Sequence, residues 1–175
     1  MRFKEVEPSK LMGNPFTMIN DDWMLITAGN KEKFNTMTAS WGGMGIMWNK
    51  NVSFVVVRPN RYTYEFMEKH DHYTLSFFDD QYRDALNLCG TKSGRDIDKV
   101  KEAGLTPVFD GDGIYFEETK IAMVCKKLYF QDLDPKNFQA DFINKLYKGD
   151  DYHRLYIGEI EAMYEQLVIN PLDLQ

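Results

Sequence analysis

Cysteine is scarce in this chain of 175 residues, which contains only Cys89 and Cys125. No Cys-x-x-Cys pair is present, so we expect both residues to be free thiols. Long apolar runs are also missing, since no stretch approaches the roughly 20 residues that a membrane helix needs. Residues 1–7 lack the apolar centre of a secretion signal. These absences argue against a disulfide scaffold and a membrane partner, and they predict a cytoplasmic location.

Positive charge is in the minority. The chain has 21 Lys and Arg residues against 27 Asp and Glu, which gives a net charge of −6. Nonspecific nucleic-acid binding needs a basic surface, so no nucleic-acid partner is expected. A few basic residues nevertheless cluster in the middle of the chain and would attract a small anion. They are Arg58, Arg61, Lys92, Arg95 and Lys99.

Several well-known site motifs are missing as well. Residues 90–96 contain glycines, Lys and Ser but lack the spacing of an NTPase phosphate loop. The glycines of residues 42–45 lack the spacing of a Rossmann dinucleotide site. The His-Asp-His run at 70–72 has no further ligands at a usable spacing, which favours a solvated turn over a metal site. No Gly-x-Ser-x-Gly nucleophile motif is present, so nothing supports hydrolysis.

Aromatic residues are abundant, at 14% of the chain. This share favours β structure together with either a stacked ligand or an apolar subunit interface. No linker or repeat divides the sequence, so one domain is expected over residues 1–175. The glycine-rich segment after Trp41 also holds Met44, Met47 and Trp48, an apolar cluster that a second subunit could cover.

Apolar periodicity predicts mainly strands. The unbroken run Phe54 to Val57 favours a strand buried on both faces. Residues 72–78 alternate, which favours a half-buried strand. The predicted strands are 23–28, 36–41, 52–58, 72–78, 121–130 and 153–164, the first two joined by a polar turn at 30–33.

Short helices are predicted between the strands. Thr63 is placed to cap one of them. Asp134-Pro135 is a strong start signal, and the apolar stripe Phe138, Phe142 and Leu146 follows it. The predicted helices are 64–69, 79–88 ending at Gly90, 96–103 ending at Gly104, and one starting at Asp134. The combination indicates a mainly β (α+β) fold, a β-barrel with short helical insertions.

Three polar segments are candidates for ligand binding. Thr36, Thr38 and Ser40 alternate along one strand face and could bind a ligand, although an exposed Thr-rich strand has the same pattern. Arg58 and Arg61 precede a helix start and suit a phosphate, although pairing with nearby glutamates is the simpler alternative. Residues 90–96 suit an anion-binding loop or a helix-capping turn.

In this order the segments resemble the flavin reductase-like, FMN-binding split-barrel family, and within it the flavoredoxin-type branch. The resemblance rests on residues 35–42, 57–63, 75–78, 90–96 with 98–99, and His153 with 156–159. It implies a split barrel, a homodimer and one FMN per subunit near the subunit interface. The cofactor-binding residues that it implies are Asn35, Thr36, Met37, Thr38, Ala39, Ser40, Trp41, Arg58, Arg61, Tyr62, Thr63, Cys89, Gly90, Lys92, Ser93, Gly94 and His153.

The resemblance further implies an oxidoreductase in which FMN carries the chemistry, so no protein residue is assigned a catalytic role. NAD(P)H would be the transient co-substrate, and a small molecule or a protein would be the acceptor. Lys92 or His153 is a candidate cation for stabilising reduced flavin. Two alternatives stay open: an FMN electron carrier fed by a protein donor, and a flavin-free binding module. A thiol role for Cys89 is also possible, but a small buried filler is favoured.

Overall fold

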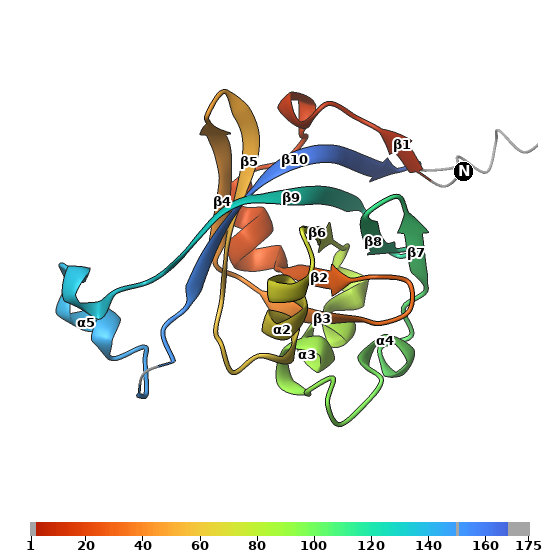
Figure 1. Cartoon of the computed structure of the whole chain (residues 1–175). Coiled ribbons are helices and arrows are strands. Elements are labelled where there is room, and N and C mark those ends of the chain that lie inside the picture. Colours follow the sequence, from red (N-terminus) through yellow and green to blue (C-terminus); the bar gives the residue numbers. More distant parts are fainter. Residues whose placement is uncertain (1–2, 150, 168–175) are drawn as a thin grey trace, which may run out of the picture.

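The computed structural model of the chain describes residues 3–149 and 151–167, and most of its strands form one antiparallel sheet (Figure 1). The order in the sheet is β3-β2-β6-β9-β10-β5-β4, and β1 pairs with β10. A separate hairpin contains β7 and β8. The strand bounds are β1 Phe3–Glu5, β2 Met24–Gly29, β3 Phe34–Ala39, β4 Gly42–Met47, β5 Lys50–Val57, β6 His72–Phe77, β7 Pro107–Asp110, β8 Gly113–Phe116, β9 Ile121–Asp132 and β10 Arg154–Gln166.

Short helices connect these strands. Their bounds are α1 Pro15–Thr17, α2 Tyr62–Lys69, α3 Arg83–Thr91, α4 Lys99–Glu102 and α5 Asp141–Asn144, with a π-helical turn at Met18–Asp22 and 3-10 turns at Pro8–Lys10, Asp80–Tyr82 and Pro135–Asn137. No helix within the described part of the chain is long and apolar enough to cross a membrane. The chain is therefore mainly β with helical insertions, as the sequence predicted.

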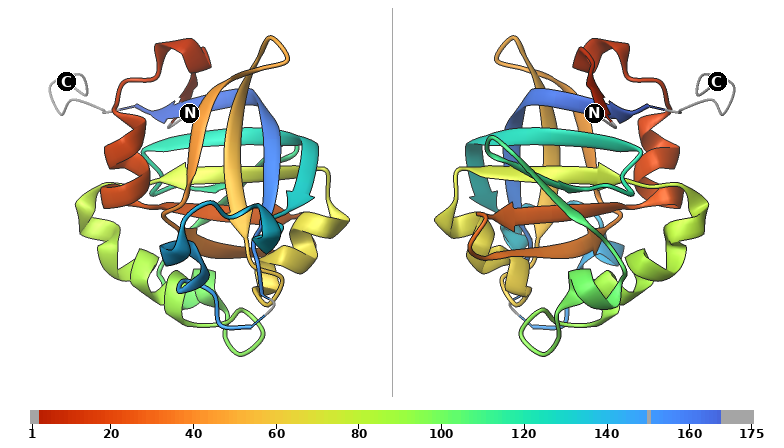
Figure 2. Two further views of the ribbon diagram at one scale, coloured as in Figure 1. Left: turned by 90° about the vertical axis from the view of Figure 1, so that its left-hand side faces the viewer. Right: turned by 90° about the vertical axis from the view of Figure 1, so that its right-hand side faces the viewer.

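The sheet is strongly curved. Figure 2 shows β4 and β5 running across the direction of β2, β3 and β6. The register of β10 against β9 shifts after Ile157 and again after Ile160, and such bulges bend and twist a strand. The two ends of the strand order, β3 and β4, are consecutive in the chain and are joined by Ser40 and Trp41. This junction carries part of the candidate site.

Strand β2 is buried on both faces because one face lines the barrel and the other lies under helices. Met24, Ile26 and Ala28 belong to the main apolar core. Leu25, between them, packs in a second cluster with Leu86 of α3. Alternate residues of a strand point to opposite faces, so this division follows from the two-residue period. The second cluster holds α3 against β2 and β3.

Both cysteines are free thiols and buried, which confirms that prediction. Cys125 lies in the barrel interior, where the Ser53 hydroxyl bonds to the Tyr73 phenol at 2.6 Å and donates to Cys125 Sγ at 3.3 Å. Gly158 approaches this group closely, and a Cβ there would lie 2.5 Å from Tyr73 Oη. Glycine is thus required where β10 passes the buried phenol.

Two strands differ from their predicted burial. Strand β6 is buried from Tyr73 onward instead of half-buried, because the β7–β8 hairpin covers its outer face. The Ile114 amide of that hairpin donates to the Thr74 hydroxyl at 3.1 Å. Strand β5 is not buried on both faces: Ser53, Val55 and Val57 are buried, whereas Phe54 and Val56, on the opposite face, stay partly exposed.

The prediction of one continuous helix starting at Asp134 is wrong. Asp134 does cap, but only the 3-10 turn Pro135–Asn137, and α5 is a separate short turn. Phe142 is 64% exposed and Leu146 44% exposed. An amphipathic helix needs a surface on which to bury its stripe, and here only Phe138 packs, against the rings of Tyr147 and Tyr152. Figure 1 shows α5 beyond the ends of β9 and β10, away from the body of the barrel.

Other helix ends shift by a few residues. Helix α3 starts at Arg83, after a 3-10 turn, and continues past Gly90 to Thr91. Helix α4 is shorter than predicted, because Asp98 caps it by accepting from the Lys101 amide. Thr63 does not cap α2. Thr63 is the second residue of α2, and Arg61 is the N-cap residue.

Candidate functional site

Two adjoining cavities lie where β3, the start of α2 and the end of α3 meet. The first, of about 200 Å³, is lined by Arg61, Lys92, Arg95 and Lys99 with neutral neighbours, and we name it the basic cavity. The second, of about 290 Å³, contains Trp41 and His153, and we name it the aromatic cavity. Met37, Thr38 and Arg61 line both, so the two are continuous.

Positive charge dominates the basic cavity. All four ionised side chains in its lining are cations, and the lining contains no carboxylate. Arg95 is already engaged: it bonds to Glu65 at 2.5 Å and lies over the Tyr62 ring at 4.7 Å. Within residues 3–149 and 151–167, Arg61 and Lys92 make no ion pair. A site built this way attracts an anion.

The loop that closes the basic cavity is held by a close backbone contact. A Cβ on Gly94 would lie 2.0 Å from Asn35 Oδ1. Asn35 cannot move away freely, since its buried amide donates to the Thr63 hydroxyl at 2.7 Å. The Ser93 hydroxyl accepts from the Arg95 amide at 3.2 Å and tightens the same turn. Glycine at position 94 therefore lets the loop pack directly on β3 and α2.

The aromatic cavity offers flat surfaces. Trp41 is 43% exposed, and its ring centroid lies 5.1 Å from that of His153. Val56, Ala39 and Ser40 complete the wall. Aromatic rings of this kind stack well on a planar ligand.

His153 is neutral at pH 7. Burial, with a smaller contribution from the charges of Arg58 and Arg61, lowers its pKa to about 4, although Asp151 acts in the opposite direction. Its Nδ1 lies 2.9 Å from the Tyr147 phenol. A neutral imidazole can donate or accept a hydrogen bond, but it cannot serve as the cation considered from the sequence.

Arg58 is bound to protein groups. Its guanidinium donates to Asp151 at 2.7 Å and to the Leu146 carbonyl at 2.8 Å, and it lies over the Tyr147 ring at 4.9 Å. The hydrogen bond from Arg58 lowers the pKa of Asp151. Arg58 thus lines the aromatic cavity while anchoring residues that follow α5. The glutamate partners considered from the sequence are not its partners.

Most of the residues that the sequence indicated line one of the two cavities. Those in the basic cavity are Met37, Thr38, Arg61, Tyr62, Thr63, Cys89, Gly90, Lys92 and Ser93. Those in the aromatic cavity are Met37, Thr38, Ala39, Ser40, Trp41, Arg58, Arg61 and His153.

Asn35, Thr36 and Gly94 lie outside both linings. The Thr36 hydroxyl is buried and bonds to the Thr27 hydroxyl at 2.9 Å. The Thr38 hydroxyl donates to the Leu86 carbonyl at 2.5 Å, although Thr38 still lines both cavities. The strand face that alternates hydroxyls is therefore used largely for joining β3 to β2 and α3.

Cys89 lines the basic cavity, but the residue is only 1% exposed. Burial raises the pKa of its thiol to about 11, with Lys99 acting weakly against that shift. A thiol that stays protonated is a poor nucleophile. The environment fits a small buried filler.

Sequence reasoning left several lining residues out of the site. Lys99, Asn60, Thr91 and Arg95 line the basic cavity, and Val56 lines the aromatic one. Lys99 and Arg95 were visible as members of the basic cluster. Tyr147, which contacts His153, carries no local signal, since it follows an exposed helical turn.

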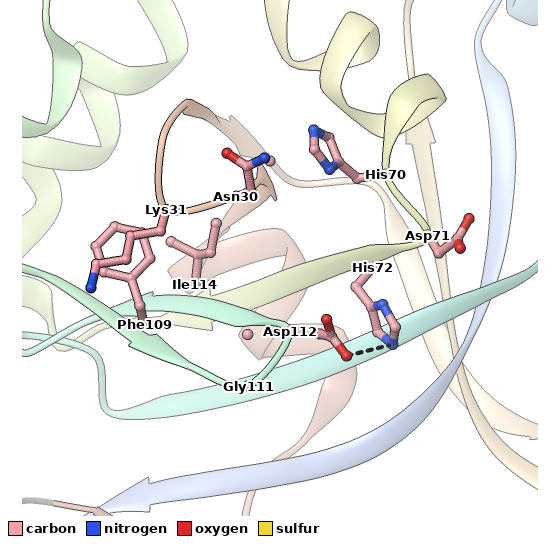
Figure 3. Close-up of a pocket in the computed structure, with 11 residues that line it drawn as sticks. Asn30, Lys31, His70, Asp71, His72, Phe109, Gly111, Asp112 and Ile114 are labelled. Atoms are coloured by element: carbon pink, nitrogen blue, oxygen red, sulfur yellow. Dashed lines mark ion pairs between the residues drawn. The ribbon is translucent and has the colours of Figure 1, made fainter.

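A separate cavity, drawn in Figure 3, measures about 500 Å³. It is lined by the β2–β3 turn, residues 70–72 and the β7–β8 turn. His72 Nε2 lies 3.0 Å from Glu161 and 3.8 Å from Asp112, so its ring is engaged by carboxylates of the protein. Across the described residues, no group of three or more His, Cys, Asp or Glu is placed to hold a metal ion.

Comparison with known proteins decides the family. The family model described as flavin reductase like domain matches residues 19–172. This chain belongs to that family. The family assignment that the sequence suggested is thereby confirmed. A search of curated protein sequences gave no significant match.

Solved structures agree with the fold of a flavin reductase like domain. An FMN-binding domain of a flavin reductases-like enzyme from Shewanella baltica superposes with a TM-score of 0.68 at 18% identity, covering 94% of this chain and 77% of that one. A flavoredoxin from Methanosarcina acetivorans gives 0.66 at 20%, covering 92% and 76%. An NADH:FAD oxidoreductase from Streptomyces globisporus gives 0.61 at 11%, covering 81% and 73%. At these identities the likeness shows the fold.

Proposed function

We propose that this flavin reductase like domain binds FMN and passes electrons from NAD(P)H through the flavin to an acceptor. The observation that carries the proposal is the continuity of the two cavities. In the first, every ionised side chain of the lining is a cation, the second adds the rings of Trp41 and His153, and the two share Met37, Thr38 and Arg61. A phosphate joined to a planar ring system by a polar chain has the same arrangement of properties.

The basic cavity fits the phosphate end. Arg61 and Lys92 have no ion pair within the described residues, and the hydroxyls of Thr91 and Ser93 stand in the same lining. Charge-assisted hydrogen bonds from such groups are among the strongest that proteins make to phosphate. The Arg58 guanidinium is committed to Asp151 and Leu146, so we assign it to holding the cavity wall.

The aromatic cavity fits the ring. Trp41 and Met37 would contact its apolar surface, and neutral His153 would provide one hydrogen bond at its polar edge. Bound FMN would supply reversible electron-transfer chemistry, while the protein binds and orients it. The neutrality of His153 removes it as a charge-stabilising group.

We also propose a homodimer. Apolar side chains are exposed along β4 and beside it: Ile46 is 71% exposed, Trp48 53% and Phe16 84%. Trp41 lines the aromatic cavity and also a neighbouring apolar cavity of about 440 Å³ that includes Phe16 and Met44. Burying this surface against a second copy would cover the open side of the ring site. The cytoplasmic location and the nature of the acceptor stay predictions from the sequence.

Anaerobic reduction tests the proposed electron route. The protein is loaded with FMN, NADH or NADPH is added without oxygen, and flavin absorbance is followed. Rapid bleaching supports the reductase. Bound flavin that stays oxidised would instead favour an electron carrier fed by a protein donor, and failure to bind FMN would reject both.

A pair of aromatic variants tests the site. Trp41→Ala should weaken FMN binding, because it removes a wall of the aromatic cavity. Phe142→Ala is the control, since Phe142 is an exposed aromatic residue of α5 that lines neither cavity. Equal effects of the two changes would contradict the assignment of the ring to the aromatic cavity.

A further inference from the structure

Lys99 is a buried cation. It is 7% exposed and stands at the first position of α4, directly after the capping residue Asp98. Its ammonium donates to the Thr36 carbonyl at 3.0 Å and to the Cys89 carbonyl at 2.8 Å. It therefore ties β3 to the last turn of α3 beneath the loop that closes the basic cavity.

No carboxylate balances this charge among residues 3–149 and 151–167. Both acceptors are neutral carbonyls, and the charged group that most affects Lys99 unfavourably is Arg61, another cation. Burial is the main cause that lowers the pKa of Lys99, and the charge of Arg61 lowers it further. Enclosing an ammonium group without a counter-charge costs free energy, so the protein holds Lys99 in an unfavourable state unless an anion is bound nearby.

One N–H of Lys99 is left without a protein acceptor in the described structure. An ammonium group has three donors, and two of them are used by Thr36 and Cys89. Lys99 also lines the basic cavity, whose other cations, Arg61, Lys92 and Arg95, are all exposed residues. Exposed cations lose much of their strength to solvent screening, whereas a buried one does not.

We infer that the Lys99 ammonium binds the phosphate of the ligand from inside the protein and selects a phosphorylated flavin over one without phosphate. The inference rests on the proposed flavin binding and deepens it. Two carbonyls fix the position of the ammonium, so the remaining donor is pre-oriented toward the cavity. Arg61 and Lys92 would contact the same phosphate from its solvent-exposed side.

A comparison of FMN with riboflavin isolates the phosphate contact. Wild-type protein should bind FMN at least about tenfold more tightly than riboflavin. In Lys99→Met the affinity for FMN should fall about 10- to 100-fold while that for riboflavin stays the same, so the preference disappears. Lys101→Met is the matched control: Lys101 is an exposed lysine of the same short helix, and its change should leave both affinities unaltered.

A purely structural role gives a different result. If Lys99 only joined β3 to α3, Lys99→Met would weaken FMN and riboflavin binding equally, which would overturn the inference. An unchanged FMN preference in Lys99→Met would overturn it too. Lys99→Gln, which keeps N–H donors on a side chain one bond shorter and removes the charge, should lose the preference in the same way.

A measurement on the wild-type protein covers the case in which neither variant folds. The ε-carbon NMR signal of Lys99 should shift on adding FMN and not on adding riboflavin, and equal shifts would reject the contact. The proposed function is tested separately. If the wild-type protein binds neither FMN nor riboflavin, the proposal that it is a flavin-binding protein is wrong. A wild-type protein that binds both equally rejects only the role of Lys99.

Discussion

The Tyr147 phenol lies 2.9 Å from Nδ1 of His153, at the edge of the aromatic cavity. A phenol that donates to Nδ1 of a neutral imidazole leaves the ring proton on Nε2. Nε2 is then a hydrogen-bond donor of fixed position, and an acceptor atom of a ligand in the cavity could bind to it. Tyr147 is itself held in place by Arg58 over its ring.

This arrangement predicts that stability falls in acid. His153 takes up a proton near pH 6.5 in the unfolded chain but only near pH 4 in the folded protein. The unfolded state binds more protons between these values, so up to about 3 kcal/mol of stability is lost as pH falls from 6.5 to 4. Urea unfolding across this range should show a weaker pH dependence for His153→Gln. Identical slopes for the two proteins would contradict the lowered pKa.

Gly94→Ala should loosen the loop over the basic cavity. A Cβ would collide with Asn35, and relieving that contact breaks the buried hydrogen bond to Thr63. We expect a loss of about 1–3 kcal/mol of stability and weaker FMN binding. Gly45→Ala is the control, since the nearest atom to its Cβ would be 3.9 Å away. Thermal unfolding and FMN titration check both, and an unaltered Gly94→Ala protein would be evidence against the close packing.

Ile46→Glu should convert the proposed dimer to a monomer. Ile46 is 71% exposed on the outermost strand of the sheet, where a buried charge in an interface would be costly. Gln81→Glu adds the same charge at another exposed position and should leave the dimer intact. Sedimentation velocity at micromolar concentration decides the point. A wild-type monomer would remove the proposal.

Lys92→Met should weaken FMN binding without moving the flavin midpoint potential. Lys92 lines the basic cavity but not the aromatic one, so its charge acts on the phosphate end. Affinity should fall by roughly tenfold, the loss of one exposed charge-assisted contact. Spectroelectrochemistry of the bound flavin measures the potential. A large potential change would place Lys92 beside the ring instead.

Local sequence pattern predicted six of the ten strands that the structure describes and missed β1, β4, β7 and β8, and it predicted the helices less well. Strand periodicity placed β2, β9 and β10 within a few residues, because alternation is a property of neighbours in the chain. The helix proposed from Asp134 failed because Phe142 and Leu146 of its apolar stripe stay exposed, and no local pattern reveals whether a surface lies opposite them.

The candidate site, like the fold, was predicted only in part from the sequence. The sequence by itself determined that one stretch between Asn35 and Lys99 supplies hydroxyls, glycines and cations in the order of a flavin reductase like domain. Only the tertiary structure decided which of them face a cavity. Thr36 turned toward Thr27, and Arg58 paired with Asp151, which lies 93 residues further along the chain. Lys99, one cation among several in the sequence, is the buried one. Burial and pairing depend on contacts between distant segments, so they are fixed only when the sheet and helices pack together.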